Sequence, residues 1–187
     1  MVPSMAWTAW ITGLPGSGKS IITEALSEIL KNDGIKFDIL RVDELRRIVT
    51  PNPTYSEEER EMVYAALTYT ALTLNRNGIN VLVDATGNRR MYREKARHLI
   101  SDFMEVYVRC PIEVCIEREK LRRESRGAPR GIYDKAFKGI SKTVPGLGVP
   151  YEEPLNPEVT VDSSKLKPLE SAKIIYQAIK ERFYKER

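Results

Sequence analysis

A glycine-rich segment near the start of the chain has the residue types needed to hold phosphate groups. Gly13 and Gly18, followed by Lys19 and Ser20, satisfy the spacing G-x-x-x-x-G-K-[ST] after a predicted strand and at the start of a predicted helix. Glycines let backbone N–H groups converge on phosphate oxygens, the lysine reaches the β- and γ-phosphates, and the serine hydroxyl binds Mg²⁺. The predicted ligand is a magnesium nucleoside triphosphate. The residues predicted to bind it are Gly13, Leu14, Pro15, Gly16, Ser17, Gly18, Lys19 and Ser20.

Two aspartates follow predicted strands and are candidates for chemistry on that phosphate. Asp43 is spaced from Arg46 as D-x-x-R, so both side chains can point into a cleft at the carboxyl end of a sheet. A carboxylate there can take the proton of an attacking hydroxyl, which makes Asp43 and Lys19 the predicted catalytic residues; alternatively, Asp43 only caps a short helix. Asp84 is the predicted Mg²⁺ carboxylate beside Ser20, with a turn-forming role as the alternative.

The elements that must position these residues alternate along the chain. Short apolar runs with β-branched or aromatic residues alternate with longer segments of helical period. This pattern predicts an α/β fold, a doubly wound five-stranded parallel sheet with flanking helices. The expected strands are 6–12, 37–42, 79–84, 105–109 and 158–161. The expected helices are 19–31, 56 to the 77–78 turn with Ser56 and Glu59 as a capping box, and one that begins after Pro168. The apolar stripe expected on the second helix comprises Val63, Leu67, Tyr69 and Leu74.

Length and composition narrow the class of protein. The 187 residues suit one domain, and 42% hydrophobic with 30% charged residues is typical of a globular chain. The longest apolar run is too short to span a membrane and the chain opens on no signal peptide, so we expect a cytoplasmic protein. A formal charge of +4 suits an anionic ligand but is too small to indicate nucleic-acid binding. Cys110 and Cys115 are expected to be reduced and packed. The lone histidine, His98, is expected on a helix surface, and Trp7 and Trp10 are expected in the core, with a subunit contact as the alternative.

The glycine-rich loop alone does not separate a kinase from a nucleotide switch or a motor. Residues 84–87 read D-x-x-G, as in GTPases, yet no N-K-x-D motif for reading guanine follows, and 187 residues leave no room for a motor. These observations favour phosphoryl transfer to a small molecule. The chain is therefore interpreted as a single kinase domain, with a lid at about 118–138 and a Gly/Pro-rich substrate loop at about 139–157. The lid arginines alternatively form only a solvated surface.

Together these motifs resemble those of adenylylsulfate kinases, which transfer phosphate from ATP to the 3′-hydroxyl of adenosine 5′-phosphosulfate. Residues 10–20 resemble the family pattern W-x-T-G-L-P-G-S-G-K-[ST], and residues 55–60 resemble F-S-x-x-D-R. Residues 105–108 are similar to E-V-Y-V, and residues 130–136 to the lid segment K-G-L-Y-x-K-A. The most specific likeness is at residues 150–158, which read P-Y-E-E-P-L-N-P-E against P-Y-E-x-P-x-N-P-E.

The resemblance implies roles for individual residues. It implies ATP and Mg²⁺ as cofactors, Asp43 as the base, and Arg118 at the start of a lid that closes over ATP. It also implies a small nucleotide as substrate and a homodimer as a possible assembly. Four residues are implied to bind the sulfonucleotide: Arg46, Tyr55, Arg60 and Lys142. Of these, Tyr55 would stack on the adenine.

The sequence departs from the family pattern almost entirely on the acceptor side. Residues 63–66 read V-Y-A-A where the family has N-I-R-R, and residues 144–146 read V-P-G where it has F-T-G. An amide, two guanidiniums and an aromatic ring are therefore missing. Residues 86–90 read T-G-N-R-R in place of I-S-P-Y-R, and the lid is longer. The candidates to replace the missing contacts are Arg90 above all, with Arg89, Arg93, Arg122, Arg123, Arg126 and Arg130.

Two other functions remain open from the sequence alone. One is a kinase of the same scaffold that phosphorylates a different hydroxyl, on a nucleotide, a nucleic-acid end or a small metabolite. The D-x-x-G segment after the third strand favours it. The other is a regulatory module that binds or hydrolyses nucleotide without a small acceptor. An acceptor panel separates the first from the family activity, and acceptor-stimulated turnover excludes the second.

Overall fold

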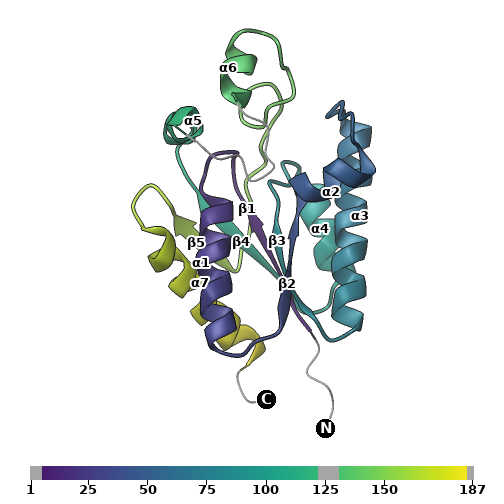
Figure 1. Cartoon of the computed structure of the whole chain (residues 1–187), viewed down its shortest axis with the longest axis vertical. Helices are drawn as coiled ribbons and strands as arrows, with labels where there is room; N and C mark the ends of the chain where they lie inside the picture. Colours follow the sequence, from purple (N-terminus) through teal and green to yellow (C-terminus); the bar gives the residue numbers. More distant parts are fainter. Residues whose placement is uncertain (1–5, 122–130, 185–187) are drawn as a thin grey trace.

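Five parallel strands form the centre of the structure, a computed structural model that describes residues 6–121 and 131–184 (Figure 1). Their order across the sheet is β2-β3-β1-β4-β5. The strands are β1 (Thr8–Thr12), β2 (Phe37–Arg41), β3 (Asn80–Asp84), β4 (Phe103–Arg109) and β5 (Val159–Asp162). The predicted doubly wound parallel sheet is confirmed, and each predicted strand boundary lies within two residues of the observed one.

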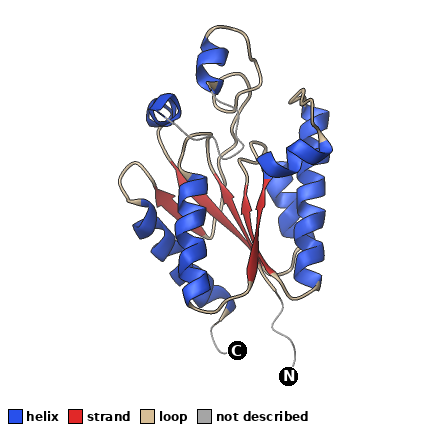
Figure 2. Ribbon diagram, viewed as in Figure 1, coloured by secondary structure: helices blue, strands red, loops and turns tan. Residues whose placement is uncertain are grey.

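Helices cover both faces of this sheet (Figure 2). They are α1 (Lys19–Asn32), α2 (Val42–Val49), α3 (Glu57–Arg76), α4 (Arg90–Leu99), α5 (Ile112–Leu121), α6 (Ile132–Phe137) and α7 (Pro168–Phe183). Helices α1 and α7 pack together on one face, while α3 and α4 cover the other. Helix α6 and the loop around it stand beyond the carboxyl ends of the strands (Figure 1). The carboxyl edge of the sheet is therefore overhung by the segments predicted as lid and substrate loop.

Alternation along β1 divides the core into two layers. Ala9 and Ile11 pack into the cluster under α1 and α7, whereas Trp10 between them packs under α3 and α4. This is the period of two expected for a strand buried on both faces. Trp7 and Trp10 are both buried, and Trp10 Nε1 donates to Ala85 O at 3.2 Å. The two tryptophans therefore belong to the core, as predicted.

The buried stripe of α3 differs from the predicted one. Val63 and Leu67 face the core as expected, but Tyr69 is 65% exposed and Tyr64 is buried instead. Residues two apart on a helix lie about 200° apart around its axis, so Tyr69 cannot share a face with Leu67. The prediction that Tyr69 is buried was therefore wrong, and Tyr64 lies on the inner face of α3 instead.

The capping box predicted at the start of α3 is half formed. Ser56 is the N-cap, and its hydroxyl accepts from Glu59 N at 3.2 Å. The Glu59 carboxylate turns to Thr54 instead of Ser56: Thr54 Oγ1 donates to it at 2.7 Å. Glu59 is therefore available to pair with other groups near the sheet edge.

The two cysteines are buried in this fold, and the lone histidine is exposed. Cys110 and Cys115 are free and buried, as predicted, and His98 lies on the exposed surface of α4. Within residues 6–121 and 131–184, every helix is too short or too polar to cross a bilayer.

Candidate active site

A cavity of about 790 Å³ lies at the carboxyl edge of the sheet. The neighbouring order β2-β3-β1 brings three strand ends together there, so the loops that follow them share one site. The sequence-predicted residues that line this cavity are Pro15, Gly16, Gly18, Lys19, Ser20, Asp43, Arg46, Tyr55, Arg60, Asp84 and Arg118. The nucleotide loop and the predicted acceptor residues thus face one continuous space.

The glycine-rich loop is shaped by close backbone packing. Gly16 has φ of +79°, and a Cβ there would lie 2.5 Å from the carbonyl oxygen of Cys115. Only glycine fits such a position, because both the backbone conformation and the space exclude a side chain. Lys19 Nζ donates to Gly13 O at 3.0 Å and to Leu14 O at 2.9 Å. The ammonium is therefore held over the loop, where phosphates of a bound nucleotide would lie.

Ser20 and Asp84, the two predicted Mg²⁺ ligands, both line this cavity. Ser20 stands in the first turn of α1, and Asp84 is the last residue of β3, paired in register with Ile11 of β1. The part of the chain that the structure describes contains no cluster of three or more His, Cys, Asp or Glu side chains able to hold a metal. A hydroxyl and one carboxylate fit Mg²⁺, which keeps several waters and binds substrate phosphates.

Asp43 lies at the second position of α2 and faces the cavity. The N-cap of this helix is Arg41, so the alternative that Asp43 is only a helix cap is wrong. The strand end at Arg41 pairs with Asp84 in register, which places the two predicted acidic residues at adjacent strand ends. Their separation onto α2 and β3 leaves distinct positions for a base and a metal ligand.

Arg46 is fixed in the cavity wall by a buried ion pair. Its guanidinium donates to the Glu59 carboxylate and lies over the Tyr55 ring, 4.9 Å from the centroid. Glu59 also accepts from Tyr55 N at 3.2 Å. Burial by itself raises the pKa of Glu59, but hydrogen bonds from Thr54 and Arg46 outweigh it and hold that pKa below its usual value. Glu59 therefore stays ionised and organises both acceptor-side residues.

Arg60 joins three segments around the acceptor side. Its Nε donates to Tyr55 O at 3.1 Å, Nη1 to Asn88 Oδ1 at 3.2 Å, and Nη2 to Thr143 O at 2.6 Å. These contacts tie α3 to the loop after β3 and to the substrate loop. Burial lowers the pKa of Arg60, although the guanidinium stays charged because its ordinary pKa is so high.

Arg118 of α5 lies over the opposite end of the cavity, beside the glycine-rich loop. Its Nη1 donates to Ser163 Oγ at 3.1 Å, and its Nη2 donates to Ser163 O at 2.7 Å. The Ser163 hydroxyl in turn donates to Ser17 O at 2.7 Å. From α6, the Tyr133 hydroxyl donates to Pro15 O at 2.7 Å. The described parts of the predicted lid are thus anchored on the nucleotide loop.

Comparison with known proteins decides the family. The family model described as adenylylsulphate kinase matches residues 5–162 of this chain. The chain belongs to the adenylylsulphate kinase family. A "probable adenylyl-sulfate kinase" of Pyrococcus abyssi is 39% identical over 178 residues, covering 95% of this chain and 97% of the relative. A protein of the same name from Archaeoglobus fulgidus is 42% identical over 161 residues, covering 86% and 98%.

Solved structures of the adenylylsulphate kinase family agree with this fold. The Mycobacterium tuberculosis APS kinase CysC, solved in complex with AMPPNP and APS, superposes with a TM-score of 0.85 at 28% identity. The match covers 95% of this chain and 99% of that chain. A shikimate kinase from Aquifex aeolicus, at 16% identity and a TM-score of 0.54, shares the fold alone.

Several predicted acceptor contacts lie outside the cavity lining. Arg90 pairs with Glu152, whose carboxylate accepts from Arg90 N at 2.8 Å, and Lys142 is exposed between two lining residues. Their roles in acceptor binding stay predictions. Arg93 cannot replace a missing family contact, because it is fully buried and committed to Glu105 and to the carbonyls of Gly87 and Glu152. The candidates Arg122, Arg123, Arg126 and Arg130 lie outside the described residues.

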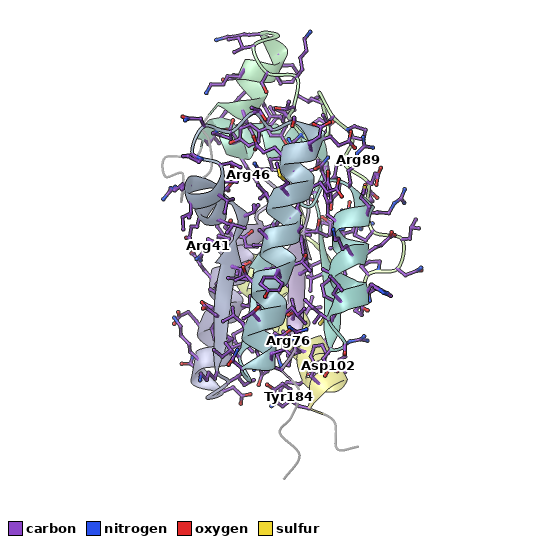
Figure 3. The ribbon with its side chains drawn as sticks, turned by 90° about the vertical axis from the view of Figure 1, so that its right-hand side faces the viewer. Arg41, Arg46, Arg76, Arg89, Asp102 and Tyr184 are labelled. Atoms are coloured by element: carbon purple, nitrogen blue, oxygen red, sulfur yellow. The ribbon has the colours of Figure 1, made fainter. Side chains whose placement is uncertain are left out.

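Sequence reasoning missed three groups that the fold brings to this adenylylsulphate kinase site. Tyr64 lines the cavity from α3, Ser163 holds Arg118, and Glu59 holds Arg46. A signal existed for two of them. Ser163 follows β5 at the carboxyl edge, and Glu59 stands where the family pattern F-S-x-x-D-R has its acidic residue. Figure 3 shows Arg46 and Arg89 toward this end of the molecule, and Arg76 and Tyr184 at the other end.

Proposed function

We propose that this protein is an ATP-dependent adenylylsulfate kinase, which phosphorylates the 3′-hydroxyl of adenylyl sulfate to give 3′-phosphoadenylyl sulfate. One observation carries the proposal: in a member of this family, one cavity is lined both by Lys19 and Ser20 of the nucleotide loop and by Asp43 and Arg46 of α2. A donor nucleotide and an acceptor can therefore meet within one cavity, as in-line transfer requires.

The reaction is one displacement at the γ-phosphorus. The acceptor 3′-oxygen forms the new bond to phosphorus while the bond to the β,γ-bridging oxygen breaks, and ADP leaves with that electron pair. Asp43 takes the proton of the 3′-hydroxyl. Lys19 balances negative charge that develops on the transferred group, since it is already held over the nucleotide loop. Mg²⁺, when bound, neutralises charge on the β- and γ-phosphates, with Ser20 and Asp84 as the ligands from this chain.

Acceptor binding is assigned to the group organised by Glu59. Arg46 and Arg60 supply positive charge for an anionic nucleotide, and the Tyr55 ring supplies a surface for its base. At the other end, Arg118 lies beside the loop that holds the triphosphate. Lys142 and Arg90 do not line the cavity in this structure, and we propose that they contact the acceptor from its rim. The cytoplasmic location and the homodimer remain predictions.

Coupled ADP release with Mg-ATP tests the function directly. Rates are compared without acceptor and with increasing adenylyl sulfate, and the nucleotide product is identified by chromatography. Saturable stimulation with the 3′-phosphorylated product is the expected result. A Lys19→Ala variant is the control, because it removes the group that contacts the β- and γ-phosphates. ATP binding without stimulation by adenylyl sulfate would contradict the proposal and direct the search to other hydroxyl acceptors.

A further inference from the structure

Tyr64 is a polar side chain in the cavity wall that the family pattern does not explain. It stands on α3 within the segment V-Y-A-A at residues 63–66, where the family has N-I-R-R. The ring is almost completely buried, yet Tyr64 lines the same cavity as Asp43, Arg46 and Arg60. Tyr64 thus brings a hydroxyl to the position of the family's isoleucine, within the segment that lost an amide and two guanidiniums.

The position of the Tyr64 hydroxyl is fixed by its neighbours. The ring stacks on Tyr92 with centroids 4.7 Å apart and lies at a tilt to Trp10 at 6.1 Å. The oxygen accepts a hydrogen bond from Gly87 N at 3.0 Å. The backbone after β3 therefore occupies one lone pair of the hydroxyl and sets the direction in which its proton can point.

The hydroxyl proton is available for a ligand. Burial raises the pKa of Tyr64 more than the charges of Arg60 and Arg46 lower it, so the phenol keeps its proton at neutral pH. Among residues 6–121 and 131–184, the Tyr64 hydroxyl accepts a hydrogen bond but donates none. A buried donor without an acceptor costs free energy, which a ligand oxygen in the cavity would recover.

The charges near Tyr64 indicate which kind of ligand oxygen its hydroxyl would bind. The charges of Arg60 and Arg46 act on Tyr64 more strongly than the opposite charge of Asp43, and all three side chains line the cavity with it. A hydroxyl donor in a cavity that two guanidiniums also line suits an anionic oxygen better than a neutral hydroxyl. We propose that the Tyr64 hydroxyl donates a hydrogen bond to an anionic oxygen of the acceptor's phosphosulfate group and thereby selects acceptors with an anion there. This inference rests on the proposed function.

A pair of tyrosine-to-phenylalanine substitutions isolates the hydroxyl. Tyr64→Phe removes the proposed donor, whereas Tyr92→Phe removes an equally buried hydroxyl from the stacked partner, which does not line the cavity. Calorimetry measures the Kd for adenylyl sulfate and for ATP in wild type and both variants, and inhibition assays measure the Ki of adenosine, which has no anion. Thermal unfolding shows that each variant is folded.

The expected result is a Kd for adenylyl sulfate about tenfold higher in Tyr64→Phe, the size expected for one hydrogen bond to a charged group. The Ki of adenosine and the Kd for ATP stay at the wild-type values, as do all constants of Tyr92→Phe. An unchanged Kd in Tyr64→Phe, or an equal loss for adenosine and adenylyl sulfate, overturns the inference alone. Wild-type protein that shows neither binding of adenylyl sulfate nor ADP release with it contradicts the proposed function instead.

Discussion

The guanidinium of Arg46 is paired with the carboxylate of Glu59 inside the wall of the active-site cavity. Both side chains are buried, at 7% and 9% exposure, and they come from different helices, α2 and α3. Glu59 also accepts from Thr54 and from the backbone of Tyr55, the one non-glycine residue with positive φ among those described. A single carboxylate therefore holds a cation and a strained aromatic residue in the acceptor half of the site.

Removing the Glu59 charge should destabilise the protein. Glu59→Gln leaves the Arg46 cation buried without an anion, and breaking a buried pair in this way lowers the free energy of unfolding by about 3 kcal/mol. Urea unfolding at neutral pH measures the change. The control is Glu58→Gln, since Glu58 is exposed on the neighbouring turn and its substitution should leave stability nearly unchanged. Equal stability of the two variants would contradict the assigned role of Glu59.

The same pair gives an expected pH dependence. The folded-state pKa of Glu59 lies below its unfolded value of about 4.3, so its stabilisation is present above that pH and is lost as pH falls through the folded pKa. The difference in unfolding free energy between wild type and Glu59→Gln should therefore shrink in acid. Urea titrations from about pH 7 to about pH 3 check this. A constant difference over that range would show that the ionised carboxylate is not the stabilising form.

Asp43→Asn should separate chemistry from nucleotide binding. An amide of the same shape cannot take the acceptor proton, so we expect kcat to fall by about 10² to 10⁴-fold. The Kd for ATP should change little, because Lys19 and the glycine-rich loop are intact. Steady-state kinetics and calorimetry provide the two values. Glu44→Gln, one residue further along α2 and exposed, is the matched control. Parallel losses in kcat and ATP affinity would assign Asp43 a structural role.

Gly16→Ala should damage the nucleotide loop more than a comparable change elsewhere. The new Cβ would lie 2.5 Å from the backbone oxygen of Cys115, and φ of +79° is unfavourable for alanine. Gly34 has a similar φ of +69° but open space around it. Gly34→Ala therefore tests only the cost of placing alanine in the left-handed backbone conformation, about 1–2 kcal/mol. The midpoint temperature of thermal unfolding and the affinity for ATP should both fall for Gly16→Ala. If Gly34→Ala lowers stability as much, the close approach to Cys115 is unimportant.

The Cys115 thiol should be unreactive in the folded protein. Burial, together with the neighbouring Cys110, raises the pKa of Cys115 to about 12, so almost none is thiolate at pH 8. A Cys110→Ala variant isolates this thiol for titration with a disulfide reagent and keeps burial, the main cause of the raised pKa. We expect slow labelling in buffer and fast labelling in denaturant. Rapid labelling of the native variant would show that the region around α5 opens readily.

Local sequence predicted the position of the glycine-rich loop between a strand and a helix, which the structure confirms. The loop that carries Lys19 and Ser20 is a run of consecutive residues, so its geometry follows from short-range glycine chemistry and from the strand and helix on either side. The strand ends that place Asp43 and Asp84 followed from the period of the apolar residues, because parallel strands deliver their carboxyl ends to one edge.

The acceptor half depends on contacts between residues far apart in the chain. A capping-box pattern correctly assigned the Ser56 hydroxyl, but the Glu59 carboxylate is directed by Arg46, thirteen positions away on another helix. The arginine run after β3 offered Arg93 as a substrate contact, whereas the fold buries it against Glu105. Periodicity alone does not reveal such partners, since an exposed and a paired arginine look the same in sequence.

The sequence by itself determined the α/β class, the nucleotide loop and the family, because each depends on short motifs or on the regular period of apolar residues. Only the tertiary structure decided which polar side chains face the acceptor. Tyr64 reaches the cavity and Tyr69 does not, since packing of α3 on the sheet sets the rotation of the helix. That rotation is chosen by the sum of buried contacts across layers, which no local pattern encodes.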